Sequence, residues 1–144
     1  MIHRDISNKL LGLANQVPVV TVIGPRQSGK TTLVKHCFPE YTYVNLEDPV
    51  HRMLAKEDYR VFFETYKEPV IIDEVQRVPE LLSAIQVMVD EDRGKNGRFI
   101  LTGSHQPGLQ RGIAQSLAGR TSMLTLLPLS MNELEEEGLL EELS

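Results

Sequence analysis

The sequence predicts an α/β fold of three layers, in which helices cover both faces of a parallel sheet. Five predicted strands alternate with predicted helices along the 144 residues. The central three strands are apolar throughout, which is typical of strands that are buried on both faces. Hydrophobic residues make up 41% of the chain and charged residues 24%, so the chain can bury a core and suits one domain.

The first half of the chain alternates between the two periodicities of regular structure. Ile6, Leu10 and Leu13 follow the spacing of one helix face, and Pro18 closes that helix. The β-branched run VVTVI comes next and is typical of a buried strand, whereas YTYVNL predicts a strand by β propensity. Pro39 stops the helix between these two strands. The predicted elements here are helices at 4–16, 30–37, 49–56 and 58–66 and strands at 19–23 and 41–46.

The second half repeats the alternation. A buried run, VII, follows Pro69, and Pro79 suits the first position of a helix whose inward stripe extends from Leu81 to Val89. Glycines at 94 and 97 mark a turn, and Pro128 follows the last strand. The predicted elements here are strands at 70–72, 98–102 and 122–127 and helices at 79–89 and 109–118.

The net charge of −5 is unevenly distributed. Six of the 20 acidic residues lie in the last 14 residues, where no base occurs, so residues 1–130 carry 15 bases and 14 acids. This balance excludes a strongly basic nucleic-acid footprint. We expect a core at 1–130, followed at 131–144 by an acidic helical tail or the start of a truncated further domain.

The single cysteine, Cys37, excludes an intramolecular disulfide framework and a zinc ribbon. No apolar run approaches the ~20 residues that a bilayer span needs, and the first residues, MIHRDISNKL, lack the apolar stretch of a signal peptide. We therefore expect a cytoplasmic protein with no membrane segment.

The stretch GPRQSGKT fits the pattern G-x-x-x-x-G-K-[ST] between a predicted strand and a predicted helix. Such a loop turns backbone N–H groups toward a phosphate, and the helix start adds its own N–H groups and positive dipole end. Lys30 is expected to reach the β- and γ-phosphates and Thr31 to ligate Mg²⁺. A chance glycine-rich turn is the alternative, and a dinucleotide fingerprint G-x-G-x-x-G does not occur. The predicted nucleotide-binding residues are Gly24, Pro25, Arg26, Gln27, Ser28, Gly29, Lys30, Thr31 and Thr32.

Polar residues follow two of the other apolar strands. Asp73 and Glu74 end the strand at 70–72, at the sheet edge where open α/β folds bind ligands. We expect Asp73 to hold Mg²⁺ and Glu74 to polarise the attacking water, although an Asp-Glu pair by itself is also typical of a solvated edge. Thr102 and Ser104 are equally placed to contact the γ-phosphate or the water, or to form a strand-ending turn.

Six stretches together resemble a known family: GPRQSGKTTL, VIIDEVQ, FILTGS, SLAGR, LLPLS and NELEEEG. They resemble the AAA+ ATPase domain of a bacterial and archaeal group whose members carry an additional C-terminal domain of unknown function. The resemblance runs from about Pro18 to Glu137 and implies a P-loop NTPase sheet in the order 5-1-4-3-2. The chain ends at Ser144, so the helical lid of such ATPases is expected to be absent.

The resemblance also implies roles for individual residues. Gly24, Gly29, Lys30 and Thr31 match Walker A, and Asp73 and Glu74 match Walker B. Ser104, with Thr102 as the alternative, matches sensor 1. Arg120 in SLAGR is a candidate γ-phosphate arginine that acts in cis or from a neighbouring subunit, and its alternative role is a cation at a helix C-terminus. The predicted catalytic residues are therefore Glu74, Lys30, Ser104 and Arg120, and the predicted metal ligands are Thr31 and Asp73.

The function expected from these residues is Mg²⁺-dependent binding of ATP and its hydrolysis to ADP and phosphate. A nucleotide-gated binding module for DNA or a protein, with little hydrolysis in isolation, is the alternative. A small-molecule kinase is a third candidate, which the Asp-Glu pair disfavours because it suits water activation. The expected partners are ATP and ADP, and the sequence leaves open a homo-oligomer and a DNA or protein partner.

Overall fold

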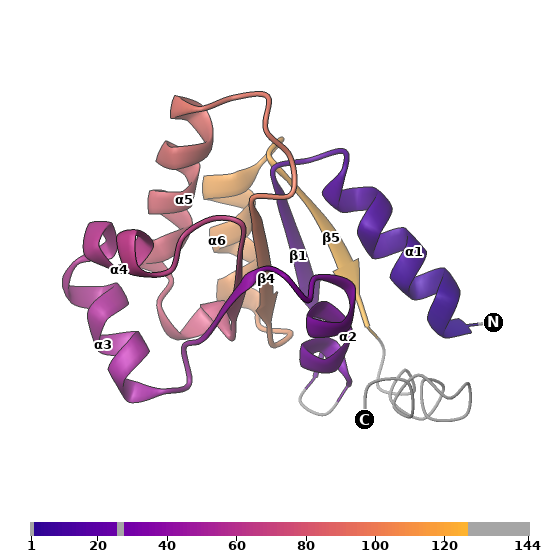
Figure 1. The fold of residues 1–144 in the computed structure, drawn as a ribbon. Coiled ribbons are helices and arrows are strands. Elements are labelled where there is room, and N and C mark those ends of the chain that lie inside the picture. Colours follow the sequence, from indigo (N-terminus) through magenta and orange to yellow (C-terminus); the bar gives the residue numbers. More distant parts are fainter. Residues whose placement is uncertain (1, 26–27, 127–144) are drawn as a thin grey trace.

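A computed structural model of the chain describes residues 2–25 and 28–126, with side chains described from residue 5 onward. Helices and strands alternate through nearly all of this part (Figure 1). The helices are α1 (Ile2–Ala14), α2 (Lys30–Cys37), α3 (Pro49–Glu57), α4 (Tyr59–Thr65), the short 3₁₀ helix η1 (Val75–Arg77), α5 (Glu80–Glu91) and α6 (Pro107–Leu117). The strands are β1 (Val19–Ile23), β2 (Thr42–Asn45), β3 (Val70–Asp73), β4 (Phe99–Gly103) and β5 (Thr121–Thr125).

The five strands form one parallel sheet in the order β2-β3-β4-β1-β5. This is the predicted order 5-1-4-3-2 read from the other edge, so the predicted fold class and strand order are confirmed. After β1 the chain crosses to β2 at the far edge of the sheet and returns through β3 to β4 beside β1. It then places β5 on the other side of β1, so the direction of the connections switches at β1. Open sheets of this kind bind ligands beside such a switch, at the carboxyl ends of the strands.

Alternate residues of the strands face two separate cores. On one face, Ile72 and Leu101 pack in the core that α3 to α6 cover, and on the other, Ile71 and Ile100 pack in the core under α1 and α2. Figure 1 shows α1 and α2 on one side of the sheet and α3 to α6 on the other. The predicted three layers follow, because side chains of a strand alternate between its faces and both sets here are apolar.

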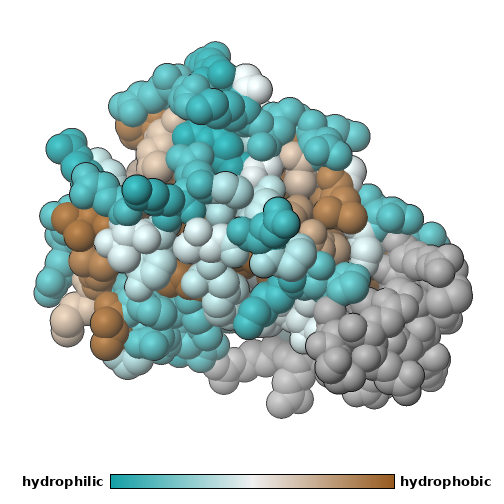
Figure 2. Space-filling view, in the orientation of Figure 1, coloured by the Kyte–Doolittle hydropathy of each residue, from teal (hydrophilic) through white to brown (hydrophobic). Residues whose placement is uncertain are grey.

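Two predictions fall on residues outside the described part of the chain. These are the acidic tail or following domain at 131–144 and the final residue of the strand expected at 122–127. Within the described part, no helix is both long enough and apolar enough to cross a membrane. The visible face is largely hydrophilic in Figure 2, with apolar side chains exposed over α3 and α4 that include Val50, Met53 and Val61.

Candidate functional site

The carboxyl ends of β1, β3 and β4 bring three sequence segments to one edge of the sheet. Gly24 directly follows β1, and its N–H donates to the carbonyl of Gly103 at the end of β4, at 3.1 Å. The loop between β1 and α2 therefore starts against β4, while Asp73 and Glu74 arrive from β3 on the other side of β4. The sheet order thus gathers the segments predicted to act together, although up to about 80 residues separate them in the chain.

The loop that leads into α2 has a close approach at its start and a left-handed residue at its end. A Cβ at Gly24 would lie 2.7 Å from Ser28 Oγ and 3.2 Å from the carbonyl oxygen of Leu126. Gly29 has φ 86°, a conformation in which glycine lacks the strain of other residues, and it caps α2 without a side-chain hydrogen bond. The first N–H groups of α2 are thus left without a side-chain cap, as at a helix start that binds an anion.

Ser28 supplies a direct test of whether this loop suits a phosphate. Its Oγ is buried and has no hydrogen-bond partner within the described ranges, although buried polar atoms are nearly always paired. A phosphate oxygen would supply the missing partner. Pro25 lies at the start of the loop, and Thr32 lies in the first turn of α2. Arg26 and Gln27 lie outside the described residues.

Lys30 and Glu74 form a buried ion pair at the centre of the site. Lys30 Nζ lies 3.0 Å from Glu74 Oε1, and the two side chains are only 5% and 8% exposed. Glu74 is the one non-glycine residue of the described chain with positive φ, at 62°, and its N–H donates to Thr102 Oγ1 at 2.9 Å. A strained backbone held by a buried hydrogen bond fixes the direction in which this carboxylate leaves β3, and such strain is frequent at functional sites.

Asp73 accepts hydrogen bonds from three hydroxyl groups of three different elements. Thr31 and Tyr43 donate to its Oδ2, at 2.9 and 2.5 Å, and Thr102 donates to its Oδ1. The Thr31 hydroxyl donates its hydrogen bond to Asp73, which leaves the lone pairs of the Thr31 oxygen free for a cation. A carboxylate and a hydroxyl oxygen side by side are ligands of the kind that Mg²⁺ prefers, so the residues present fit this ion.

Tyr43 is a site residue that the sequence analysis missed. Burial raises the pKa of its hydroxyl, and so does the Asp73 carboxylate beside it, so Tyr43 remains a proton donor at neutral pH. The register of β2 against β3 explains its position. Tyr43 and Asn45 are two residues apart in β2, so they lie on the same face of the sheet. Asn45 lies opposite Asp73, and Tyr43 therefore shares a sheet face with Asp73.

Thr102 and Ser104, between which the sequence could not decide, differ in burial and in the groups that they contact. Thr102 is fully buried and bonds both the Asp73 carboxylate and the Glu74 backbone. Ser104 is half-buried, with its Oγ 3.5 Å from Glu74 Oε2 and 3.3 Å from Gln76 Nε2. Both residues therefore contact the Asp-Glu pair, Thr102 from beneath and Ser104 beside the carboxylate that was predicted to activate water.

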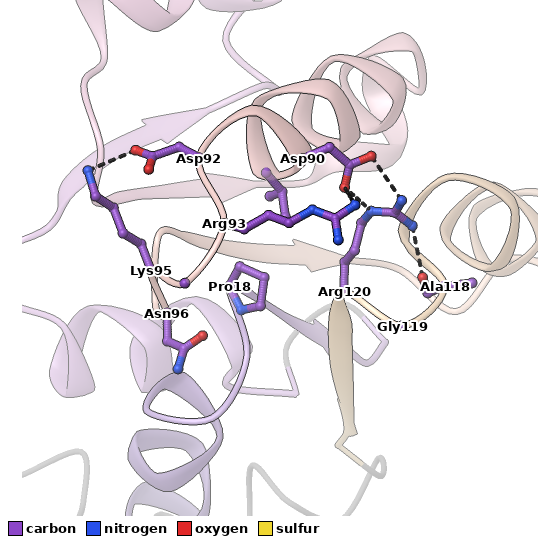
Figure 3. A pocket seen from close by; sticks show the side chains of 11 residues that line it. Pro18, Asp90, Asp92, Arg93, Lys95, Asn96, Ala118, Gly119 and Arg120 are labelled. Carbon is purple, nitrogen blue, oxygen red and sulfur yellow. Dashed lines mark hydrogen bonds and ion pairs between the residues drawn. The ribbon is translucent and has the colours of Figure 1, made fainter.

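Arg120 is the predicted site residue that the structure does not bring to this edge. It precedes β5, its carbonyl accepts from Val19 N–H at the start of β1, and the length of β1 puts it roughly 16 Å from the loop at about 3.3 Å per residue. Its guanidinium makes a bidentate pair with Asp90 at 2.8 and 2.9 Å (Figure 3). It lines a hollow of about 350 Å³ at the amino edge of the sheet.

Action of Arg120 on the phosphates of its own chain, one of the two alternatives left open by the sequence, does not fit this geometry, because the full length of β1 separates Arg120 from the loop. The alternative, action on a neighbouring subunit, stays a prediction. The guanidinium in turn holds the pKa of Asp90 below its usual range.

Comparison with known proteins agrees with this geometry. A family model described as an AAA domain matches residues 16–135. The uncharacterised protein Rv2008c of Mycobacterium tuberculosis is 34% identical over 134 residues, which cover 91% of this chain and 30% of that protein. The uncharacterised protein MJ1544 of Methanocaldococcus jannaschii is 29% identical over 143 residues, which cover 92% of this chain and 31% of that protein. The chain thus spans about three tenths of the length of these curated relatives.

Among solved structures, AMPPCP-bound DnaA from Aquifex aeolicus has a similar fold. The TM-score is 0.59 at 12% identity, and the match covers 98% of this chain and 50% of DnaA. At that identity the likeness shows a shared fold, including the sheet whose carboxyl edge holds the residues above.

Proposed function

The chain belongs to the AAA domain family, and on this premise we propose that it binds ATP together with Mg²⁺ and hydrolyses the ATP to ADP and phosphate. The observation that carries the proposal is the meeting of Lys30 with Glu74 and of Thr31 with Asp73 at the carboxyl edge of the sheet. One helix start thus presents a cation and a hydroxyl to two adjacent carboxylates, the groups that phosphoryl transfer needs.

Nucleotide binding rests on the loop and the first turn of α2. The N–H groups at the uncapped start of α2 would face the phosphates, and the buried Ser28 hydroxyl would gain its missing partner there. Lys30 turns from Glu74 to the β- and γ-phosphates. Thr31 and Asp73 would hold Mg²⁺, which would supply neutralisation of the phosphate charge.

Hydrolysis rests on Glu74. When Lys30 moves to the phosphates, Glu74 Oε1 loses its ion-pair partner and becomes free to accept a proton from the attacking water. The backbone N–H of Glu74 stays hydrogen-bonded to Thr102, so the backbone that carries the Glu74 side chain keeps its position. Most of the rate enhancement then comes from positioning and from charge stabilisation around the transferred group.

Calorimetry and phosphate release test this proposal. Titration with ATP and Mg²⁺ is expected to release heat, and Lys30→Ala is expected to weaken that binding at least tenfold. Lys9→Ala, on the exposed face of α1, is the matched control. The absence of binding heat in the unaltered chain would refute the proposal. Binding without any release of phosphate would instead favour the nucleotide-gated binding module.

We infer that Arg120 acts on the nucleotide of a neighbouring copy, because its own loop lies at the opposite edge. The chain is then expected to assemble when ATP is bound. Size measurement by light scattering with and without a non-hydrolysable ATP analogue tests this, and an unchanged monomer mass in both would remove the role of Arg120.

A further inference from the structure

Gln76 contacts both the side chain predicted to activate water and the residue predicted to act as a sensor. Its Nε2 donates to Glu74 Oε2 at 2.5 Å and to Ser104 Oγ at 3.3 Å. Its Oε1 accepts from the backbone N–H of Ser104 at 3.4 Å. We propose that Gln76 is a positioning residue that holds the Glu74 carboxylate for hydrolysis and couples it to the end of β4, an inference that rests on the proposed function.

Chemistry determines the orientation of this amide from both sides. An ionised carboxylate only accepts hydrogen bonds, so the NH₂ group of Gln76 must face Glu74. A backbone N–H only donates, so the carbonyl oxygen must face Ser104. The reversed amide would place oxygen against oxygen at Glu74 and would lose the hydrogen bonds to Glu74 and to the Ser104 N–H. Gln76 therefore connects the end of β4 to Glu74 in one amide orientation.

The backbone of Gln76 is anchored as firmly as its side chain. Gln76 is the middle residue of η1, which follows the left-handed Glu74, and Val75 and Val78 on either side of it are fully buried. At Gly103, a Cβ would lie 3.0 Å from Gln76 Oε1 and 2.4 Å from Leu109 Cδ2, so a glycine here leaves room for the amide. The contact therefore does not depend on a freely moving side chain.

The two oxygens of Glu74 have different partners, and this gives Gln76 its role. Oε1 faces Lys30, whereas Oε2 faces Gln76 and Ser104. When Lys30 turns to the phosphates, the contacts at Oε2 are those that still hold the carboxylate. Gln76 thus limits rotation of Glu74 after the ion pair has opened, so its loss affects the chemical step and leaves nucleotide binding intact.

The first test separates a donor from a space-filling side chain. Gln76→Met keeps the length and removes the donor, and it is expected to lower kcat about 10- to 100-fold with the KM for ATP unchanged within twofold. Gln76→Glu also keeps the length but turns a like charge toward Glu74, and it is expected to lower kcat further. Gln115→Met, at an exposed position of α6, is the matched control and is expected to match the unaltered chain. Equal kcat in Gln76→Met and the unaltered chain overturns the proposal, as does a Gln76→Glu variant at least as active as Gln76→Met.

The second test asks whether Gln76 acts through Glu74. In a Glu74→Gln background the further change Gln76→Met is expected to alter residual turnover less than twofold, because the group it positions is gone. A further loss of tenfold or more in that background would show that Gln76 acts directly on water, and would overturn the positioning role.

A third measurement does not need turnover. Affinity for ADP with aluminium fluoride and Mg²⁺, which imitates the transferred group, is expected to fall about tenfold in Gln76→Met, whereas affinity for a non-hydrolysable ATP analogue is unchanged. Equal loss of both affinities would overturn the proposal in favour of a general structural role. If the unaltered chain binds neither compound, it is the proposed function that fails.

Discussion

Replacing Glu74 by glutamine is expected to reduce turnover to a small residual rate and, at the same time, to tighten the binding of a non-hydrolysable ATP analogue. The reason is that Lys30 must leave Glu74 before it can serve the phosphates, so the ion pair competes with the nucleotide. A glutamine of the same shape releases Lys30 in advance. The usual expectation for the loss of a site residue, weaker binding, is thereby reversed.

The magnitude follows from the geometry of the pair. At 3.0 Å and an effective dielectric constant of about 20, two unit charges attract by roughly 5 kcal/mol. Burial of both side chains costs desolvation energy that offsets more than half of this attraction, which leaves about 2 kcal/mol for the nucleotide to overcome. Removing that cost corresponds to an affinity gain of about 10- to 30-fold.

The same pair also predicts the effect on stability. Glu74→Gln leaves the Lys30 ammonium buried beside a neutral amide, so the free energy of unfolding without nucleotide is expected to fall by about 2 kcal/mol and Tm by about 6 °C. A saturating analogue is expected to raise Tm more in this variant than in the unaltered chain, because it supplies the charge partner that Lys30 lacks.

Isothermal titration with the analogue and Mg²⁺ measures the affinity, and thermal unfolding measures the stability. Glu64→Gln, at an exposed position of α4, is the matched control for the loss of one charge. A double-mutant cycle with Lys30→Met isolates the coupling between the two residues, which we expect to be about 2 kcal/mol. The reasoning is refuted if Glu74→Gln binds the analogue no more tightly than the unaltered chain, or if the cycle shows no coupling.

Three further outcomes are expected. Tyr43→Phe keeps the ring and removes one donor to Asp73, the proposed Mg²⁺ ligand, so the Mg²⁺ concentration for half-maximal activity should shift by about 3- to 10-fold while metal-free nucleotide binding stays constant. Gly29→Ala forces an alanine to φ 86° and should lower the free energy of unfolding by about 1–2 kcal/mol. Gly12→Ala, in an open position of helix α1, should raise it by about 0.5–1 kcal/mol. Chemical denaturation measures both. Arg120 lowers the folded-state pKa of Asp90, so the pair stabilises the chain at pH values above the unfolded-state pKa of Asp90. This stabilisation is lost as the pH falls through the folded-state pKa. Asp90→Asn should therefore lower the free energy of unfolding at pH 7 and have no effect on it in strong acid.

Much of the fold could be predicted because its signals are local. The apolar runs of β1, β3 and β4 and the proline and glycine residues between elements determine where strands and helices begin and end, within a few residues. The motif from Gly24 to Thr31 is likewise local, since it lies between one strand end and the next helix start. The strand order, which is not local, came from the family resemblance and is confirmed.

The parts of the site that could not be predicted depend on side-chain direction. Thr102 lies in β4 and Ser104 directly after it, so the sequence places both at the same strand end. Only the structure shows that Thr102 bonds the Asp73 carboxylate, whereas Ser104 contacts the Glu74 carboxylate. Gln76 lies two residues after Glu74 in sequence and still escaped notice, because a single 3₁₀ turn directs its amide back onto that carboxylate. The position of Arg120 before the last strand is visible in the sequence, but its distance from the loop after β1 depends on the parallel pairing of β5 with β1.

The sequence by itself determined the candidate phosphate-binding motif, the five strands and the place of the two acidic residues, because each depends on residues that are neighbours in the chain. Only the tertiary structure decided that Tyr43 supports Asp73, that Lys30 is paired with Glu74, and that Arg120 lies far from both. The physical reason is that a parallel sheet aligns the ends of strands that are distant in sequence. Contacts between those ends depend on the register of neighbouring strands and on backbone angles, and neither can be read from the order of residues.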